Sequence, residues 1–201
     1  MESFVVRRFP VTVREYLQFL QALWDRGLQE AVRDLMPSDG DRPLAREGSD
    51  GRLRPIEAHL ESPVVLLRWD AVRAYCAWLS ACTGQNWRPL KAEEYRRAAL
   101  GLDGRCLPWG NFFDPSFACV RESHPGAPVR PLVTAFATDE SPYGLRGMAG
   151  GVREWCNADN GPVACGGSFL TPLSMVHLEE FLSLSPNTTA LDLGFRVARA
   201  C

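Results

Sequence analysis

Helical periodicity dominates the first half of the chain. Thr12 and Glu15 have the spacing of a capping box, in which the hydroxyl accepts from the Glu15 amide and the carboxylate reaches back. A short strand is expected before them, over residues 4–9, where apolar and polar positions alternate. A second, shorter helix is expected over residues 28–36. The residues that share one face of the first helix are Tyr16, Phe19, Leu20 and Leu23.

The middle of the chain opens with an apolar run. Residues 64–67 are uninterrupted Val and Leu, which predicts a buried strand. Asp70 can cap a third helix that ends at Gly84, and a fourth helix is expected over residues 92–100. The side chains that the third helix turns inward are Val72, Tyr75, Cys76 and Leu79.

The second half of the chain lacks long helical periods. After Gly101 the sequence is rich in Gly, Pro and aromatic residues, which predicts turns and short strands. Residues 37–63 are polar, contain three glycines, and are expected to form a long inserted loop. Helices in the first half, with short strands and long loops in the second, indicate an α+β fold in one domain over residues 1–201.

Composition and charge narrow the class of protein. The chain has 201 residues, of which 46% are hydrophobic and 23% charged, and its formal net charge is −2. These values are ordinary for a folded domain, and near-neutral charge disfavours nucleic acid or an anionic membrane as the partner. No apolar run approaches the roughly 20 residues of a membrane span. Without a secretory signal, the cytoplasm is the default location, and surface display stays open.

The cysteines are odd in number, whereas a secreted disulfide framework normally pairs them all. They are Cys76, Cys82, Cys106, Cys119, Cys156, Cys165 and Cys201. No C-x-x-C motif occurs among them, which disfavours a thiolate zinc site or a redox dithiol. The expectation is therefore buried, reduced thiols that pack as small hydrophobic groups.

Short motifs follow one another from about Phe9 to Arg199. They are residues 10–16, 63–65 with Trp69, 74–79, 88–99, 108–111, 141–145, 148–150, Glu154 with Trp155, 166–169, and 194–196. In this order they resemble the formylglycine-generating enzyme / sulfatase-modifying factor family, whose domains have a C-type-lectin-like fold. Residues 113–115 and 120–123 also resemble versions of the domain that are appended to bacterial serine/threonine kinases.

The sequence departs from the family pattern near its start. The usual opening strand, a Gly-Gly-x-Phe-x-Met-Gly segment, is missing before Phe4. The family's Arg-Leu-Pro-Thr motif is altered at residues 88–91, so Lys91 stands where a hydroxyl would cap the next helix. Lysine cannot accept an amide hydrogen bond, and its charge opposes the positive start of a helix. We therefore expect this helix to start differently or to be less stable.

The resemblance implies a copper site in the catalytic members, where two cysteines lie five residues apart after the Gly-Gly-Ser-aromatic motif. The corresponding positions here are Thr171 and Val176. Neither supplies the soft thiolate that selects Cu(I). The related iron-dependent sulfoxide synthases use three histidines, but His59, His124 and His177 have no matching spacing. The expectation is a protein without copper that is not an enzyme.

Calcium is the remaining cofactor candidate. Family members place an Asn, main-chain carbonyls and a Glu around a Met-Ala-Gly-Asn-Val-x-Glu-Trp segment. Glu154 survives in this chain, but Gly147 lacks the expected side chain, and Cys119 replaces the Asn of a second site. Calcium needs about 6–8 oxygen ligands. A role for Glu154 as a structural hydrogen-bond acceptor is therefore favoured over calcium binding.

Residues 170–193 correspond to the stretch that crosses the exposed ligand-binding face in this family. Ordinary members carry several arginines there, whereas this chain has no Lys or Arg between Gly166 and Gly194. Apolar and hydroxyl-bearing residues suit a protein or peptide ligand better than an anionic one. The predicted ligand-binding residues are Leu170, Thr171, Pro172, Leu173, Ser174, His177, Phe181, Ser183, Ser185, Asn187, Thr188, Thr189 and Asp192.

The leading hypothesis is a non-enzymatic ligand-binding protein whose binding surface lies between Phe169 and Phe195. Variable proteins of diversity-generating retroelements use this fold and diversify this stretch at Asn codons. Only Met175, Glu179 and Glu180 lie outside the set of residues that such codons can reach. A repacked core loop is the plain alternative. Two other functions stay open: a metal-dependent, cysteine-oxidising oxygenase with relocated ligands, and a sensor or regulatory domain of a bacterial serine/threonine kinase.

Overall fold

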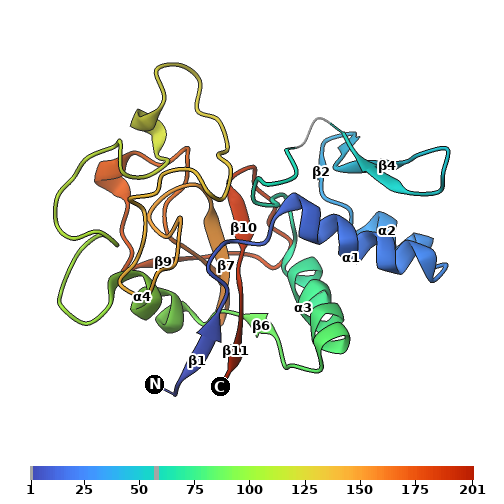
Figure 1. The fold of residues 1–201 in the computed structure, drawn as a ribbon, viewed down its shortest axis with the longest axis horizontal. Coiled ribbons are helices and arrows are strands. Elements are labelled where there is room, and N and C mark those ends of the chain that lie inside the picture. Colours follow the sequence, from blue (N-terminus) through green and yellow to red (C-terminus); the bar gives the residue numbers. More distant parts are fainter. Residues whose placement is uncertain (1, 57–58) are drawn as a thin grey trace.

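The α-helices of the described residues lie in the first half of the chain, as the periodicity predicts (Figure 1). The computed structural model describes residues 2–56 and 59–201. The helices are α1 (Val13–Asp25), α2 (Gln29–Leu35), α3 (Trp69–Thr83) and α4 (Ala92–Leu100), with the short 3-10 turns η1 (Arg121–Ser123) and η2 (Leu173–Met175). The predicted capping box opens α1: the Glu15 amide donates to the Thr12 hydroxyl (3.2 Å), and the Thr12 amide donates to the Glu15 carboxylate (2.9 Å).

The two larger sheets of the described fold have three and four strands. The first is antiparallel, with the order β1 (Phe4–Val6), β11 (Val197–Ala200) and β6 (Arg88–Pro89), and it brings the two chain ends side by side (Figure 1). The second has the order β10 (Leu193–Phe195), β7 (Arg153–Ala158), β8 (Gly161–Cys165) and β9 (Phe181–Ser183). In it, β10 runs parallel to β7, and the other pairs are antiparallel. This arrangement confirms the α+β prediction.

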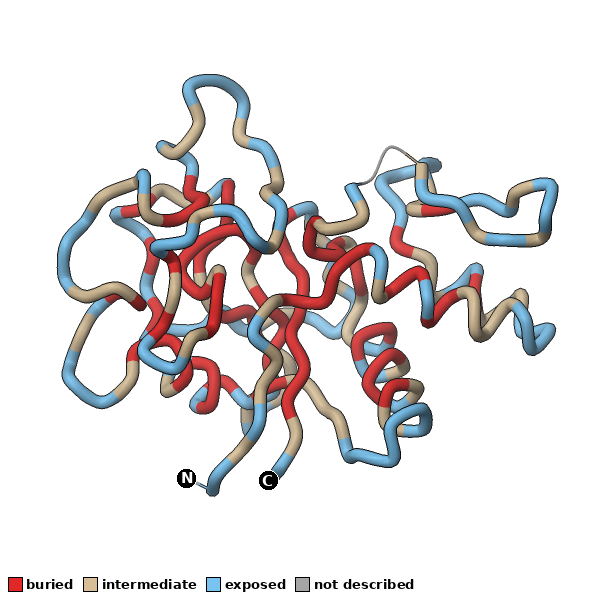
Figure 2. Tube along the Cα trace, in the orientation of Figure 1, coloured by how far each residue is buried: buried red, intermediate tan, exposed pale blue. Residues whose placement is uncertain are grey.

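The buried backbone runs through the central strands and the inward faces of the helices (Figure 2). One cluster packs α1 and α3 against the paired strands β7 and β10, and there Tyr75 stacks on Tyr16 and meets the edge of Phe195. A second cluster packs α4 against β7 and β8 around the buried Tyr95. Trp155 is fully buried, and its indole N–H donates to the Leu67 carbonyl (2.8 Å). Burial of these aromatic side chains supplies much of the hydrophobic stabilisation.

The apolar run at residues 64–67 is buried, but it does not form the predicted strand. The Val64 N–H donates to the Val11 carbonyl, and the Leu66 N–H donates to the Ala190 carbonyl. The run therefore bonds to two separate segments, where a strand would bond along one neighbour. Leu66 also has a φ of 63°, in the left-handed region, which interrupts an extended backbone.

The start of α3 also differs from the prediction. Arg68, not Asp70, is the N-cap residue, and its side chain makes no capping hydrogen bond, although the Asp70 carboxylate accepts from the Ala71 amide at 2.9 Å. Asp70 lies in the first turn, where its carboxylate pairs with Arg68 at 3.0 Å. An acidic group at this place still interacts favourably with the positive helix start. The other end is as predicted, because Gly84 takes the left-handed conformation that closes a helix.

Residues 37–63, which are expected to form a long inserted loop, contain two small hairpins in the part that the structure describes. Its strands are β2 (Ser38–Asp39) with β3 (Arg42–Pro43), and β4 (Ala45–Glu47) with β5 (Leu53–Pro55). Strands of two or three residues are too short to show an alternating hydrophobic pattern. Residues 57–58 of the expected loop lie outside the described residues.

The helix α4 begins at Ala92 without a side-chain cap from Lys91, as the altered motif predicts. The other half of a capping box is present, because the Lys91 amide donates to the Glu94 carboxylate (2.9 Å). Arg88 holds this carboxylate with two hydrogen bonds of 2.7 Å. These bonds keep the pKa of Glu94 below its usual value, against the opposing effect of its burial.

Candidate ligand-binding surface

The two ends of the predicted binding segment are joined by a buried polar contact. The Ser168 hydroxyl donates to the Asp192 carboxylate across 24 residues of chain, at 2.7 Å. Arg153 on β7 pairs with the same carboxylate at 2.9 Å. The prediction that Asp192 binds ligand is therefore wrong, because its side chain is buried. Asp192 instead anchors residues 170–191, which we call the surface loop.

The glycines before the surface loop are required by close packing. Gly166 has a φ of 82°, and a Cβ on it would meet the Tyr95 hydroxyl at 2.3 Å. A Cβ on Gly167 would lie 2.4 Å from the Ala149 carbonyl oxygen and 2.8 Å from a methyl of Val176. The motif therefore brings the backbone close to the core immediately before the loop leaves it.

Most of the predicted side chains of the surface loop are accessible, and one more correction is needed. Leu173 is buried in the second core cluster, and its N–H donates to the Glu122 carboxylate (3.0 Å). Three predicted residues are half-buried: Thr171, Pro172 and Thr188. The exposed ones are Leu170, Ser174, His177, Phe181, Ser183, Ser185, Asn187 and Thr189.

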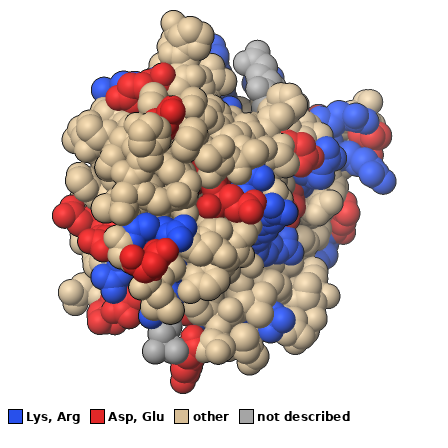
Figure 3. All heavy atoms as spheres, turned by 60° about the vertical axis from the view of Figure 1, so that its left-hand side comes forward, with Lys and Arg blue, Asp and Glu red and all other residues tan. Residues whose placement is uncertain are grey.

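The surface loop also exposes apolar side chains that the sequence did not single out as ligand-binding. They are Met175, Leu182 and Leu191, which are 64%, 53% and 49% exposed. Phe181, next to Leu182, is 51% exposed. Figure 3 turns the side of the molecule with η2 and α4 forward and shows broad uncharged areas between small groups of charges. Exposed apolar side chains gathered in one segment are typical of an interaction surface.

The Glu154 carboxylate is not available to a metal ion. Glu154 and Arg196 are both fully buried, and the Arg196 guanidinium donates to both carboxylate oxygens at 2.8–3.2 Å. The remaining Arg196 donors bond the backbone carbonyls of Arg7, Arg8 and Arg146. The predicted calcium ligand is therefore corrected: calcium does not fit here, and Glu154 serves as the structural acceptor that the sequence favoured.

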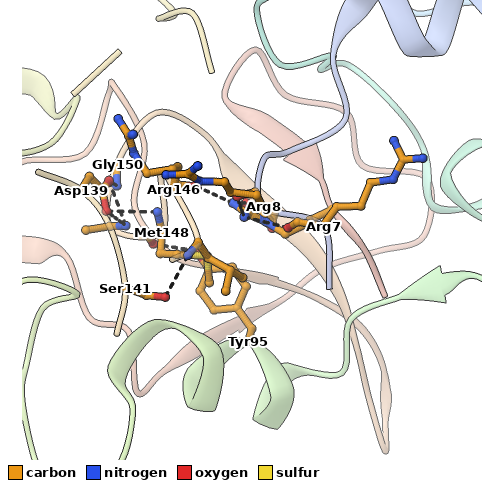
Figure 4. Close-up of polar contacts among 12 residues, drawn as sticks. Arg7, Arg8, Tyr95, Asp139, Ser141, Arg146, Met148 and Gly150 are labelled. Atoms are coloured by element: carbon orange, nitrogen blue, oxygen red, sulfur yellow. Dashed lines mark hydrogen bonds and ion pairs between the residues drawn. The ribbon is translucent and has the colours of Figure 1, made fainter. Parts of the chain in front are cut away.

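A second buried carboxylate belongs to Asp139, which Figure 4 shows beside Met148 and Gly150. Asp139 accepts backbone N–H bonds from Met148, Ala149 and Gly150 at 3.0–3.2 Å. Burial, the largest effect, raises the pKa of Asp139 to about 6, although these N–H donors and Arg196 favour its charged form. Asp139 thereby fixes the segment that precedes β7 and satisfies its buried amides.

The positions that correspond to the family's copper ligands do not fit copper. The Thr171 hydroxyl contacts the Ser168 hydroxyl (3.0 Å) and accepts from the Ser168 amide (3.1 Å). The Val176 methyls pack in the second core cluster against Gly167. Within residues 2–56 and 59–201, no three His, Cys, Asp or Glu side chains gather in a way that could hold a metal ion.

The cysteines are all free thiols, and the expectation of burial holds for four of them. Cys76, Cys119, Cys156 and Cys165 are buried, whereas Cys82, Cys106 and Cys201 are exposed, which corrects the prediction for these three. Burial raises the pKa of Cys76 and Cys119 to about 12, so both remain protonated near neutral pH. Among the described helices, none combines the length and apolar character that a bilayer crossing requires.

Proteins similar in sequence include both catalytic and inactive representatives by name. The inactive C-alpha-formylglycine-generating enzyme 2 of Bos taurus is 36% identical over 187 residues, covering 77% of this chain and 60% of its own length. The formylglycine-generating enzyme of Thermomonospora curvata is 30% identical over 173 residues, covering 68% of this chain and 55% of its own length. The chain therefore spans little more than half the length of these relatives.

Solved structures share the fold over nearly the whole chain. CarF superposes with a TM-score of 0.72 at 21% identity, covering 98% of this chain and 86% of its own. Treponema denticola variable protein 1 superposes with a TM-score of 0.67 at 19% identity, covering 98% of this chain and 84% of its own. The sequence matches the sulfatase-modifying factor enzyme 1-like domain over residues 1–201. The chain belongs to this family of formylglycine-generating-enzyme-like proteins.

Proposed function

We propose that this chain is a non-catalytic member of its family that binds a protein or peptide ligand through the surface loop. One observation carries the proposal: the loop is anchored at both ends by buried groups, yet several of its apolar side chains between these anchors face solvent. Leu170, Phe181 and Leu191 are 37%, 51% and 49% exposed. A ligand that covers such side chains gains about 25 cal/mol per Å² of apolar surface removed from water.

The charge of the surface loop supports a ligand that is not anionic. The loop has no Lys or Arg, while Glu179 and Glu180 are exposed. Thr171 and Val176, in place of two thiolates, support the non-catalytic part of the proposal, as does likeness to a relative named inactive.

Selection from a random peptide library displayed on phage tests the proposal. Binders selected on the wild-type protein are measured against Leu170→Ser and Phe181→Ser, with Leu102→Ser as the control outside the loop, because Leu102 is 78% exposed. Burying one such side chain contributes about 1.5–3 kcal/mol, so each loop variant should weaken binding about tenfold or more. Failure to select binders, or an equal loss with Leu102→Ser, would contradict the proposal.

Catalysis is tested on the same protein. It is loaded with Cu(I) or Fe(II) and incubated with a cysteine-containing peptide and oxygen, and the peptide is followed by mass spectrometry. The proposal expects no metal-dependent change in peptide mass above that of the free metal. Multiple turnovers would instead establish the oxygenase alternative with ligands other than Thr171 and Val176.

We further propose that the surface loop is a site of programmed sequence variation. Apart from Met175, Glu179 and Glu180, the residues from Leu170 to Leu193 can all be reached from Asn codons by changes at adenine. The expected genomic finding is a reverse-transcriptase gene beside a near-copy of the coding sequence for residues 169–196. Their absence would return the loop to an ordinary specialised surface, and a kinase gene fused upstream would favour the sensor-domain alternative.

A further inference from the structure

Strand β9 lies at the outer edge of its sheet and leaves backbone groups unpaired. Its register on β8 pairs Leu182 with Ala164, and the next bond on that side runs from the Leu184 N–H to the Pro162 carbonyl. Because bonding alternates along an antiparallel strand, the N–H and C=O groups of Phe181 and Ser183 point away from β8. No partner for these groups occurs in the described part of the chain.

The side chains of β9 are accessible on both faces, which is unusual for a strand in a core sheet. Its three residues are exposed, including Phe181 at 51% and Leu182 at 53%. Open edges that are apolar and uncovered readily pair with another strand, and proteins normally shield them with charge, proline or a covering element. Neither Lys, Arg nor Pro occurs within β9.

A groove of about 460 Å³ lies beside this edge, between β9, the turn that joins β7 to β8, and the start of α4. Phe181 and Ser183 line one side, and Lys91, Glu93 and Asp159 line the other. In an added strand, the residues opposite Phe181 and Ser183 would direct their side chains to the face on which this groove lies. Neither Glu93 nor Asp159 has an ion-pair partner among the described residues.

We propose that β9 binds an extended peptide segment by strand addition. Every second side chain of that segment lies in the groove, and these side chains are apolar or basic. This rests on the proposed function and names the class of its ligand. The unpaired groups of Phe181 and Ser183 select an extended backbone, and the exposed ring of Phe181 selects an apolar side chain. The groove carries the carboxylates of Glu93 and Asp159 and the single ammonium group of Lys91, so its net charge is negative. This charge favours a basic partner over a second copy of this chain, because the groove of that copy would carry the same negative charge.

A matched pair of variants at one position tests the backbone contact. Ser183→Pro removes the outward N–H and leaves the bonds from Leu182 and Leu184 to β8 in place, whereas Ser183→Ala removes only the hydroxyl. Peptides selected from the phage library should bind Ser183→Pro about two- to tenfold more weakly, the value of one hydrogen bond. Their affinity for Ser183→Ala, which keeps the outward N–H, should fall by less than their affinity for Ser183→Pro. Equal losses in both variants would overturn strand addition.

A measurement without substitution covers the case in which Ser183→Pro fails to fold. Amide hydrogen exchange is followed by NMR with and without the selected peptide. Strand addition protects the amides of Phe181 and Ser183, whereas the Leu182 amide is already bonded to β8 and should change least. Unchanged exchange at Phe181 and Ser183 in a saturated complex would overturn the proposal.

The charge preference and the alternative occupant are tested separately. Glu93→Gln with Asp159→Asn should weaken binding of the selected peptides and reduce its dependence on salt, because surface attraction is screened by ions. Size-exclusion chromatography that shows a dimer abolished by Ser183→Pro would assign β9 to a second copy and overturn the peptide proposal. If the affinity of the peptides falls with Leu170→Ser but not with Ser183→Pro, strand addition is refuted and the proposed function stands.

Discussion

Replacement of Glu154 by Gln tests the buried ion pair between Glu154 and Arg196 most directly. The substitution keeps the size of the side chain and removes its charge, so Arg196 remains fully buried without its carboxylate. The wild-type guanidinium makes contacts of 2.8, 3.2 and 3.2 Å to Glu154, and its other partners are neutral carbonyls. Glu154→Gln therefore leaves an uncompensated buried cation.

Breaking a buried ion pair from one side costs about 3–5 kcal/mol, because the remaining charge stays desolvated. The whole free energy of unfolding of a domain is about 5–15 kcal/mol, so this loss is a large share of it. At 2–4 °C per kcal/mol for a chain of this size, the melting temperature should fall by roughly 6–20 °C. Urea unfolding and thermal circular dichroism measure both quantities.

The matched control is Glu61→Gln, which removes the carboxylate from a pair on the surface. Arg14 and Glu61 lie 2.6 Å apart, and their side chains are 52% and 46% exposed. Water solvates both charges when the pair is broken, so the expected loss is at most about 1 kcal/mol. Equal losses for Glu154→Gln and Glu61→Gln would refute the reasoning from burial.

The same two proteins decide between the structural and the calcium role of Glu154. A calcium ligand would make the melting temperature of the wild-type protein rise with calcium, and Glu154→Gln would abolish this rise. The structural role predicts no calcium dependence in either protein, so the full destabilisation caused by Glu154→Gln should persist when a chelator is present. A calcium-dependent shift confined to the wild-type protein would overturn the assignment of Glu154 to Arg196.

Three further changes test other parts of the fold. The pKa of Asp139 is raised from 3.8 to about 6, so its contribution to stability is present below pH 4 and is lost as the pH rises through 6. The unfolding free energy of wild type minus that of Asp139→Asn should therefore fall by about 2 kcal/mol between pH 4 and pH 7, and a flat difference would contradict the raised pKa. Gly167→Ala places a Cβ 2.4 Å from the Ala149 carbonyl oxygen and should lower the free energy of unfolding, measured with denaturant, by about 1–3 kcal/mol. The control Gly104→Ala has open space around it and should show only the smaller strain of its positive φ. Lys91→Ser restores a hydroxyl cap to α4 and should stabilise the protein by about 1 kcal/mol, while Lys91→Ala, which offers no acceptor, should not.

The helices and the order of motifs were predictable because their signals are local. The capping box of Thr12 and Glu15 and the spacing of buried residues in α3 are read within one or two turns. The same applies to the loss of the cap at Lys91. Each of these predictions depends on neighbours only a few residues away, so the sequence alone supports it.

The predictions that were wrong depend on contacts far apart in the chain. Residues 64–67 look like a strand by composition, but their hydrogen bonds go to Val11 and Ala190. Asp192 lies between Leu191 and Leu193 in a segment with no local sign of its partners, and only the fold shows it buried beside Ser168 and Arg153. The partner of Glu154 is likewise 42 residues away, and no spacing rule points to it.

The buried contacts at the base of the surface loop explain how its accessible residues can vary without loss of the fold. Arg196 and Asp192 hold the strand end and the loop end through ion pairs to β7, and Ser168 closes the base. The exposed side chains between these anchors contribute little to core packing, because water covers them already in the folded state. Leu173, Val176 and Leu178 are the exceptions within the loop, since their side chains are buried in the core. Stability therefore rests on the base and on these buried loop residues, while the proposed function places ligand contacts on the exposed remainder, so the two roles fall on different side chains.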